Sequence, residues 1–167
     1  MSSEDAPSGE PAGSDERVFL IVVDDSEEWR AALRFACRRA QHTGGRVALM
    51  HVIEPADFQH WMAVEEVMRA EMREEAETRL HSVAEEVVEL TGQMPILHIR
   101  EGTTRDELLA LINEEPSISI LVLGAHPGAE GPGPLIQYLT TKGLGRLRIP
   151  ITIVPGNLGA EAIDTLA

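Results

Sequence analysis

The sequence predicts a single α/β domain built on a parallel β-sheet with helices on both faces. Short runs rich in β-branched residues alternate along the chain with segments whose apolar residues recur at helical spacing. At 167 residues the chain has the length of one domain with a full core. The expected strands are Val18–Val23, Val47–Ile53, Ile96–Arg100, Ile118–Leu123 and Ile149–Val154.

The first two helices are expected directly after the first two strands. In the first, apolar residues stand three and four apart from Trp29 to Ala40, with Ser26 as the expected N-cap and an end near Gly44. The second keeps this spacing for about six turns from Val64 until Gly92 stops it. Both segments are therefore predicted to bury one face against the sheet.

Two further helices complete the alternation. The third is expected from Thr103 or Thr104 to a break at Pro116, and a weaker fourth lies within Pro134 to Arg146. In the long second helix, Glu75 and Arg79 stand four apart in the order that favours an ion pair, so we expect a solvated, mutually paired face there. A strand and helix alternation of this kind predicts parallel pairing of the strands.

Composition and charge exclude several classes of function. The net charge is −14, and the 14 basic residues are scattered, with Lys142 the one lysine among them. Such a surface repels phosphate backbones and anionic lipids, so neither nucleic acid nor membrane is an expected partner. The histidines show no metal-binding spacing, and the single cysteine, Cys37, fits the apolar side of the first helix. We expect no metal site and a cytoplasmic location.

The chain divides into three expected parts. Residues 1–16 are rich in Ser, Gly, Pro and acidic side chains and resemble no signal peptide, so they are predicted to form a disordered tail. Residues 17–156 form the domain, and residues 157–167 form a C-terminal tail.

A ligand in such a sheet binds beyond the carboxyl ends of the strands, where the strand order reverses. The first strand ends at Asp24-Asp25-Ser26, the second at Ile53-Glu54, and the fourth at a glycine-rich loop that follows Gly124. If the first and fourth strands are neighbours, the acidic pair faces this loop.

The order of several motifs resembles the universal stress protein family. Val23-Asp24-Asp25-Ser26-Glu27 is similar to its opening "V-D-G-S-E", and Arg100-Glu101-Gly102 to its "R-E-G". Leu49–Val52 looks like its second strand, Leu121–Gly124 like its fourth and Ile149–Val154 like its last. The resemblance spans residues 17–155 and implies a sheet of order 3-2-1-4-5.

The resemblance also implies an ATP-binding loop, G-x2-G-x9-G-[S/T], after the fourth strand. Glycines there let amide groups approach phosphates. Counted from Gly124, the second glycine is Pro127 and the last pair is Gln137-Tyr138. Glu130 would also oppose a phosphate. We therefore expect a weakened cleft for ATP or another adenine nucleotide, at positions Val23, Asp24, Val52, Gly124, His126, Gly128, Gln137 and Tyr138.

The predicted function is a stress-response binding or signalling protein without catalytic residues of its own. One alternative is a weak ATPase or ATP-dependent switch, and another is a structural dimer that docks an unknown protein partner. A phosphorylated receiver domain is disfavoured, because the third strand ends at Arg100 without an Asp and the fifth at Pro155 without a Lys.

A homodimer through the fifth strand is also expected. In the implied order this strand lies at the sheet edge, where unpaired backbone groups need a partner. Ile149, Ile151 and Ile153 would form the contact between two copies, and the resemblance implies the same pairing.

Overall fold

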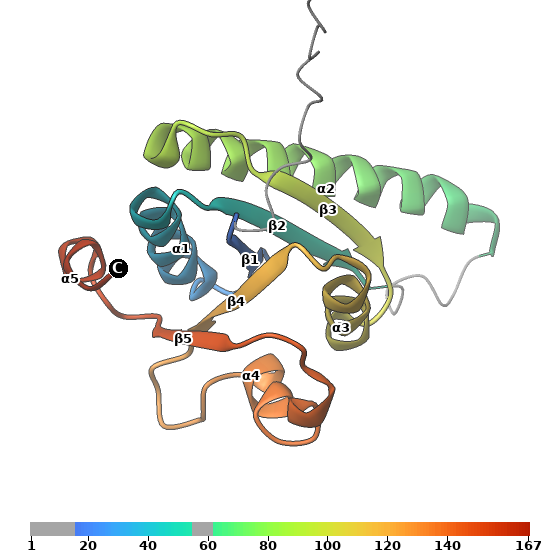
Figure 1. Ribbon diagram of the computed structural model, residues 1–167. Coiled ribbons are helices and arrows are strands. Elements are labelled where there is room, and N and C mark those ends of the chain that lie inside the picture. The colour runs from blue at the N-terminus through green and yellow to red at the C-terminus, as the bar shows by residue number, and fades with distance from the viewer. Residues whose placement is uncertain (1–15, 55–61) are drawn as a thin grey trace, which may run out of the picture.

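The computed structural model describes residues 16–54 and 62–167, so residues 1–15 of the expected tail lie outside it. Five parallel strands form one sheet in the order β3-β2-β1-β4-β5, which confirms the predicted fold class and strand order (Figure 1). The strands are β1 Val18–Val22, β2 Arg46–Ile53, β3 Ile96–Glu101, β4 Ile118–Ala125 and β5 Ile151–Pro155.

Helices cover both faces of this sheet. One face carries α1 Trp29–Thr43, α2 Met62–Thr91 and α5 Ala160–Leu166, and the other carries α3 Thr104–Glu114 and α4 Pro134–Leu139. A short 3₁₀ turn, η2 Leu144–Arg146, links α4 to β5. Figure 1 shows α2 running along the β2 and β3 side of the sheet, while α5 lies beside α1.

Alternation along β1 explains the two layers. Phe19 and Ile21 pack with α1 and α2, whereas Leu20 and Val22 pack with α3 and α4, and all four are almost fully buried. Side chains of successive strand residues point to opposite faces, so a strand covered on both sides is apolar throughout. This is why the predicted strands appear as continuous apolar runs.

Most predicted strand ends differ by one or two residues from the structure, and the starts of α1 and β5 differ for a clear physical reason. Ser26 is not the N-cap of α1, because the helix begins at Trp29 after Glu28, and the Ser26 hydroxyl donates instead to Asp24. The strand β5 begins at Ile151 rather than Ile149, because Pro150 has no amide hydrogen to extend the ladder. Ile149 is buried in the core below α3 and α4.

The end of α1 and the place of Cys37 agree with the prediction. Gly44 closes the helix in the left-handed region, with φ of 69°, and its N–H donates to Ala40 O. Cys37 is fully buried, and this burial raises the pKa of its thiol to about 12. Cys37 is therefore a core residue and not a thiolate nucleophile.

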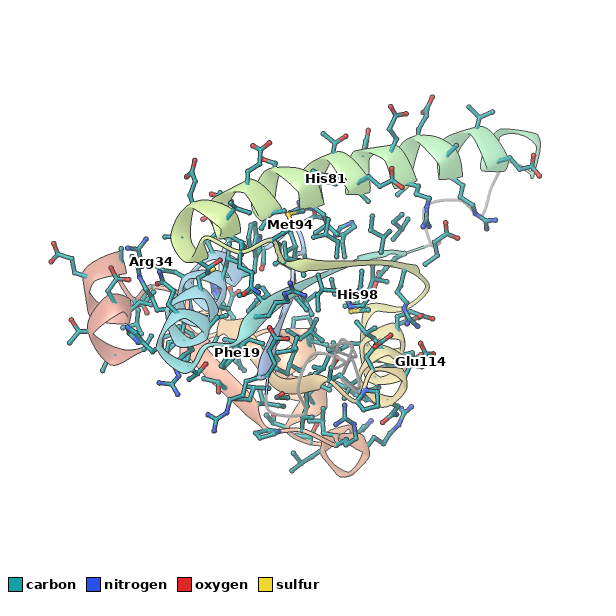
Figure 2. All side chains as sticks on the ribbon, turned by 45° about the horizontal axis from the view of Figure 1, so that its top comes forward. Phe19, Arg34, His81, Met94, His98 and Glu114 are labelled. Atoms are coloured by element: carbon teal, nitrogen blue, oxygen red, sulfur yellow. The ribbon has the colours of Figure 1, made fainter. Side chains whose placement is uncertain are left out.

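The segment after residue 156, expected only as a C-terminal tail, contains α5. Asp164 of this helix accepts hydrogen bonds from Arg34 Nε at 2.8 Å, Arg34 Nη2 at 2.7 Å and Arg38 Nε at 2.9 Å. Ile163 joins the core beside α1, and Figure 2 shows Arg34 on the α5 side of α1. An ion-paired helix with one buried anchor thus extends the domain beyond β5.

No helix among residues 16–54 and 62–167 combines the length and the apolar character needed to cross a bilayer. The 30 residues of α2 are long enough, but charged side chains occupy much of its surface.

Candidate functional site

The loop after β1 lies at the centre of the carboxyl edge of the sheet. Val23 continues the strand direction, and its N–H donates to Met50 O at 2.8 Å. The Asp24 carboxylate then accepts Ser26 N–H at 2.8 Å and Ser26 Oγ–H at 2.5 Å. This Asx-type turn reverses the chain and holds Asp24 between two cavities.

The first, which we call the β4 cavity, has a volume of about 500 Å³. It lies between the loop after β1, the start of α1 and the loop from His126 to Pro134 that follows β4. Such a volume suits a small organic molecule. Its polar lining includes Asp24, Ser26, Glu28, His126, Glu130 and Gln137, and its apolar lining includes Val22, Trp29, Val122, Leu123 and Ile136.

A close contact between β4 and α1 forms the floor of the β4 cavity. A Cβ on Gly124 would overlap the backbone carbonyl of Glu28 and lie 3.0 Å from its Cβ. Only glycine therefore fits at this position, for a packing reason that does not involve a ligand. Beside it, His126 Nδ1 lies 3.0 Å from Glu28 Oε1. The hydrogen bond with His126 lowers the pKa of the Glu28 carboxyl.

The loop after β4 offers few amide donors to a phosphate chain. Pro127, Pro132 and Pro134 have no N–H, and the His126 N–H already donates to Pro132 O at 3.0 Å. Glu130 lines the cavity beside Asp24 and Glu28, so three carboxylates face the space. The loop is glycine-rich, but its electrostatics oppose a polyphosphate.

The second, the β2 cavity, has a volume of about 450 Å³ and lies at the ends of β1 and β2 below α2. Its polar lining comprises Asp24, Asp25, His51, Glu54, Glu75, Arg79 and Thr104, and its apolar lining comprises Val52, Ile53, Met72 and Ala76. His51 Nδ1 is 2.7 Å from Val23 O, which fixes its ring against β1. Glu54 accepts the Thr104 N–H at 3.1 Å and the Thr104 hydroxyl at 2.8 Å.

Arg79 connects α2 to the loop after β1. Its Nη1 lies 3.0 Å from Asp25 Oδ1, and its Nη2 donates to Asp24 O. The expected pairing of Glu75 with Arg79 within α2 is therefore replaced by pairing across the fold. The loop offers Arg79 both a carboxylate and a backbone carbonyl, which matches the two-pronged geometry of a guanidinium.

Most of the residues predicted for the nucleotide site lie at this edge. Gly124, His126 and Gln137 line the β4 cavity, Val52 lines the β2 cavity, and Asp24 lines both. Gly128 adjoins His126, since a Cβ on it would lie 2.8 Å from His126 Nε2.

Two of the predicted residues point elsewhere. The side chain of Val23 is buried in the core with α1 and α2. Tyr138 packs on the α3 side, with Arg105 4.8 Å above its ring and Arg146 Nη1 3.1 Å from its hydroxyl. Helical geometry explains Tyr138, because a residue adjacent to Gln137 in α4 is turned by about 100°.

Sequence reasoning did not identify Glu28, Trp29 and Arg79 as lining residues. Glu28 and Trp29 were part of a predicted amphipathic helix, and Arg79 of a predicted solvated face. Each was explained locally, so no signal in the sequence pointed to the cavities. Among the described residues, no group of three or more His, Cys, Asp or Glu side chains has an arrangement that suits a metal ion.

The sheet order and the paired cavities define a class: a single-domain α/β protein with ligand-sized cavities at the carboxyl edge of a parallel sheet. The sequence profile of the Universal stress protein family matches residues 17–155, and the chain belongs to that family. No curated protein sequence gives a significant match.

Several solved structures share the fold. The UspA protein of Lactobacillus plantarum has a TM-score of 0.67 and 14% identity, covering 85% of this chain and 99% of its own. A family member from Burkholderia pseudomallei has a TM-score of 0.62 and 19% identity over 86% and 98%. A universal stress protein in complex with cAMP has a TM-score of 0.56 and 12% identity over 86% and 100%. At these identities the likeness supports the fold alone.

Proposed function

We propose that this chain is a cytoplasmic stress-response binding protein whose cleft takes an adenine nucleoside or a singly charged adenine nucleotide in preference to ATP. The observation that carries the proposal is the lining of the β4 cavity. A ligand-sized space at the carboxyl edge of the sheet combines apolar walls with three carboxylates and a proline-interrupted loop. Apolar walls suit a purine ring, and carboxylates accept hydrogen bonds from ribose hydroxyls and amino groups.

The charge of the cavity sets the order of affinities. Asp24, Glu28 and Glu130 would repel each added phosphate, while His126 is already hydrogen-bonded to Glu28. A neutral nucleoside is not repelled by these carboxylates, and a cyclic monophosphate is repelled less than a triphosphate. The cAMP complex of a family member with the same fold is compatible with this preference.

The proposal assigns binding and signalling, and no turnover, to the cleft. The His126 imidazole is engaged in the wall of the β4 cavity, because its Nδ1 lies 3.0 Å from Glu28 Oε1. The prolines leave the loop without the amide cradle that would orient a phosphoryl group for attack. A bound ligand would therefore change the state of the protein and would dissociate without being chemically altered.

The functional unit in this proposal is a homodimer formed through β5. This strand lies at the sheet edge, Ile153 is 43% exposed and Ile151 is partly exposed. Two copies paired antiparallel across a two-fold axis would satisfy the edge backbone groups and cover both isoleucines. Ile149, which the sequence analysis also placed in this contact, is buried in the core and would not touch the partner copy.

Calorimetry with adenosine, cAMP and Mg-ATP tests the proposed cleft. We expect adenosine and cAMP to bind at least tenfold more tightly than Mg-ATP, and the Mg-ATP dissociation constant to exceed about 1 μM, or −8.2 kcal/mol. Mass spectrometry of molecules released by denaturing the purified protein gives an independent reading of the ligand. Submicromolar Mg-ATP binding, or sustained ATP hydrolysis by the pure protein, would contradict the proposal and favour an ATP-dependent switch.

A further inference from the structure

Arg79 has a special position among the residues that line the two cavities. Of the described residues in the β4 and β2 cavities, it is the only arginine or lysine. It projects from α2 toward the loop after β1, at the side of Asp24 that faces away from the glycine-rich loop. The one arginine or lysine among these lining residues therefore lies at the end of β2 and not at the end of β4.

Asp24 and Asp25 hold this guanidinium in place. The carbonyl oxygen of Asp24 accepts one N–H, and the Asp25 carboxylate lies 3.0 Å from the other Nη atom. The Asp24 bond orients the group, because Asp24 directly follows Val23, whose N–H is hydrogen-bonded to Met50 O of β2. The Arg79 guanidinium is therefore held with its N–H groups oriented toward an oxygen ligand. This lowers the entropic cost of binding such a ligand.

The Asp25 carboxylate that now pairs with Arg79 is easily displaced. The Asp25 side chain is fully exposed to solvent, whereas that of Arg79 is 33% exposed. Ion pairs with an exposed partner contribute little to stability, because water solvates the carboxylate equally well. An anionic group that enters the β2 cavity can take the place of the Asp25 carboxylate without leaving a buried charge unpaired.

The remaining carboxylates of this cavity determine how much negative charge it tolerates. Asp24 is hydrogen-bonded to Ser26, and Glu54 to Thr104 at the start of α3. Glu75 lies one turn before Arg79 on α2 and also lines the cavity. Its repulsion opposes a group with several charges, so the site is suited to a singly charged phosphate ester.

We propose that Arg79 is the anion-binding and specificity-determining residue of the cleft. The phosphate of a bound nucleotide then lies in the β2 cavity, and the loop after β4 receives an uncharged part of the ligand. This inference rests on the proposed function for the identity of the ligand, and adds which end of the cleft holds its charge.

Calorimetry on the parent and four variants tests this orientation. We expect Arg79→Gln to weaken cAMP binding by about tenfold and to leave adenosine binding within about twofold, because only cAMP offers an anion. Arg79→Lys should fall between, since it keeps the charge and loses the fork. Arg73→Gln is the matched control, because Arg73 lies on α2, pairs with Glu77 and lines neither cavity. Asp25→Asn should tighten cAMP binding by about twofold.

Equal losses of cAMP and adenosine affinity in Arg79→Gln would overturn the inference, as would an equal loss of cAMP affinity in Arg73→Gln. If the parent binds neither adenosine nor cAMP, the proposed function fails, and inorganic phosphate then tests Arg79 alone. In a nuclear magnetic resonance titration with inorganic phosphate, the Arg79 Nε–H signal should shift while the Arg73 signal does not. The Arg79 signal is assigned from its loss in Arg79→Gln. An unmoved Arg79 signal, or equal shifts at both residues, would overturn the inference.

Discussion

Gly124 of β4 lies against the backbone carbonyl of Glu28, at the point where the chain enters α1. The contact leaves no room for a side chain, because a Cβ on Gly124 would overlap that carbonyl oxygen. It also brings His126, two residues further along, within 3.0 Å of the Glu28 carboxylate. One backbone approach therefore sets both the floor and the polar wall of the β4 cavity.

Replacing Gly124 with alanine is expected to destabilise the domain by about 2–3 kcal/mol, because either β4 or the start of α1 must move to admit the methyl group. Chemical denaturation of the purified variant measures this loss. Gly145→Ala is the control, because a Cβ there meets nothing within 4 Å and should leave stability nearly unchanged. Equal stability of the two variants would show that the contact is not tight.

Asp164 links α5 to α1 through Arg34 and Arg38, whose hydrogen bonds hold the pKa of its carboxyl well below the usual range. A depressed carboxyl pKa stabilises the fold above the unfolded value of about 3.9, and this stabilisation is lost as the pH falls below it. Asp164→Asn should therefore lower the melting temperature at pH 7, and the gap to the parent should narrow between about pH 4 and pH 2. Glu161→Gln, on the same helix, should leave the melting temperature equal to that of the parent at pH 7 and throughout the range from about pH 4 to pH 2. A gap that stays constant with pH would contradict the link.

Glu130 is expected to weaken the binding of phosphate-rich ligands, because it lines the β4 cavity with Asp24 and Glu28. Glu130→Gln should strengthen Mg-ATP binding by about fivefold, equivalent to roughly 1 kcal/mol for one solvent-exposed charge pair. Calorimetry measures the change, and Glu89→Gln on the exposed side of α2 controls for net charge. If both variants gain equally, the effect comes from the net charge of the protein and not from the cavity.

The β5 edge is expected to form the dimer. Lysine at both Ile151 and Ile153 should give a monomer near 18.3 kDa by light scattering, at concentrations where the parent is a dimer. Val67→Lys is the control, since Val67 is 60% exposed on α2, away from the sheet edge. A monomeric parent, or a lysine variant that stays dimeric, would show that β5 is not the interface.

The sequence by itself determined the five strands, the helices α1, α2 and α3, and the edge of the sheet at which the cavities lie. Continuous apolar runs predicted strands buried on both faces, and helical spacing predicted α1, α2 and α3, because these periodicities are local properties of the chain. The position of Asp24 at the end of β1 and of Gly124 near the end of β4 followed from the same runs. The strand order came from the resemblance to a family, and the sheet confirms it.

Only the tertiary structure decided which polar groups meet. Glu28 and His126 are 98 residues apart, and Arg79 and Asp25 are 54 apart, so neither pair leaves a trace in local spacing. The packing of α5 on α1 through Arg34 and Asp164 is equally long-range, at 130 residues. A side chain on a helix has many partners of similar energy nearby in sequence, and the fold selects among them by the direction in which the packed helix presents it. For this reason the sequence predicted the sheet edge at which the cavities lie, while the distribution of charge along them emerged only from the assembled fold.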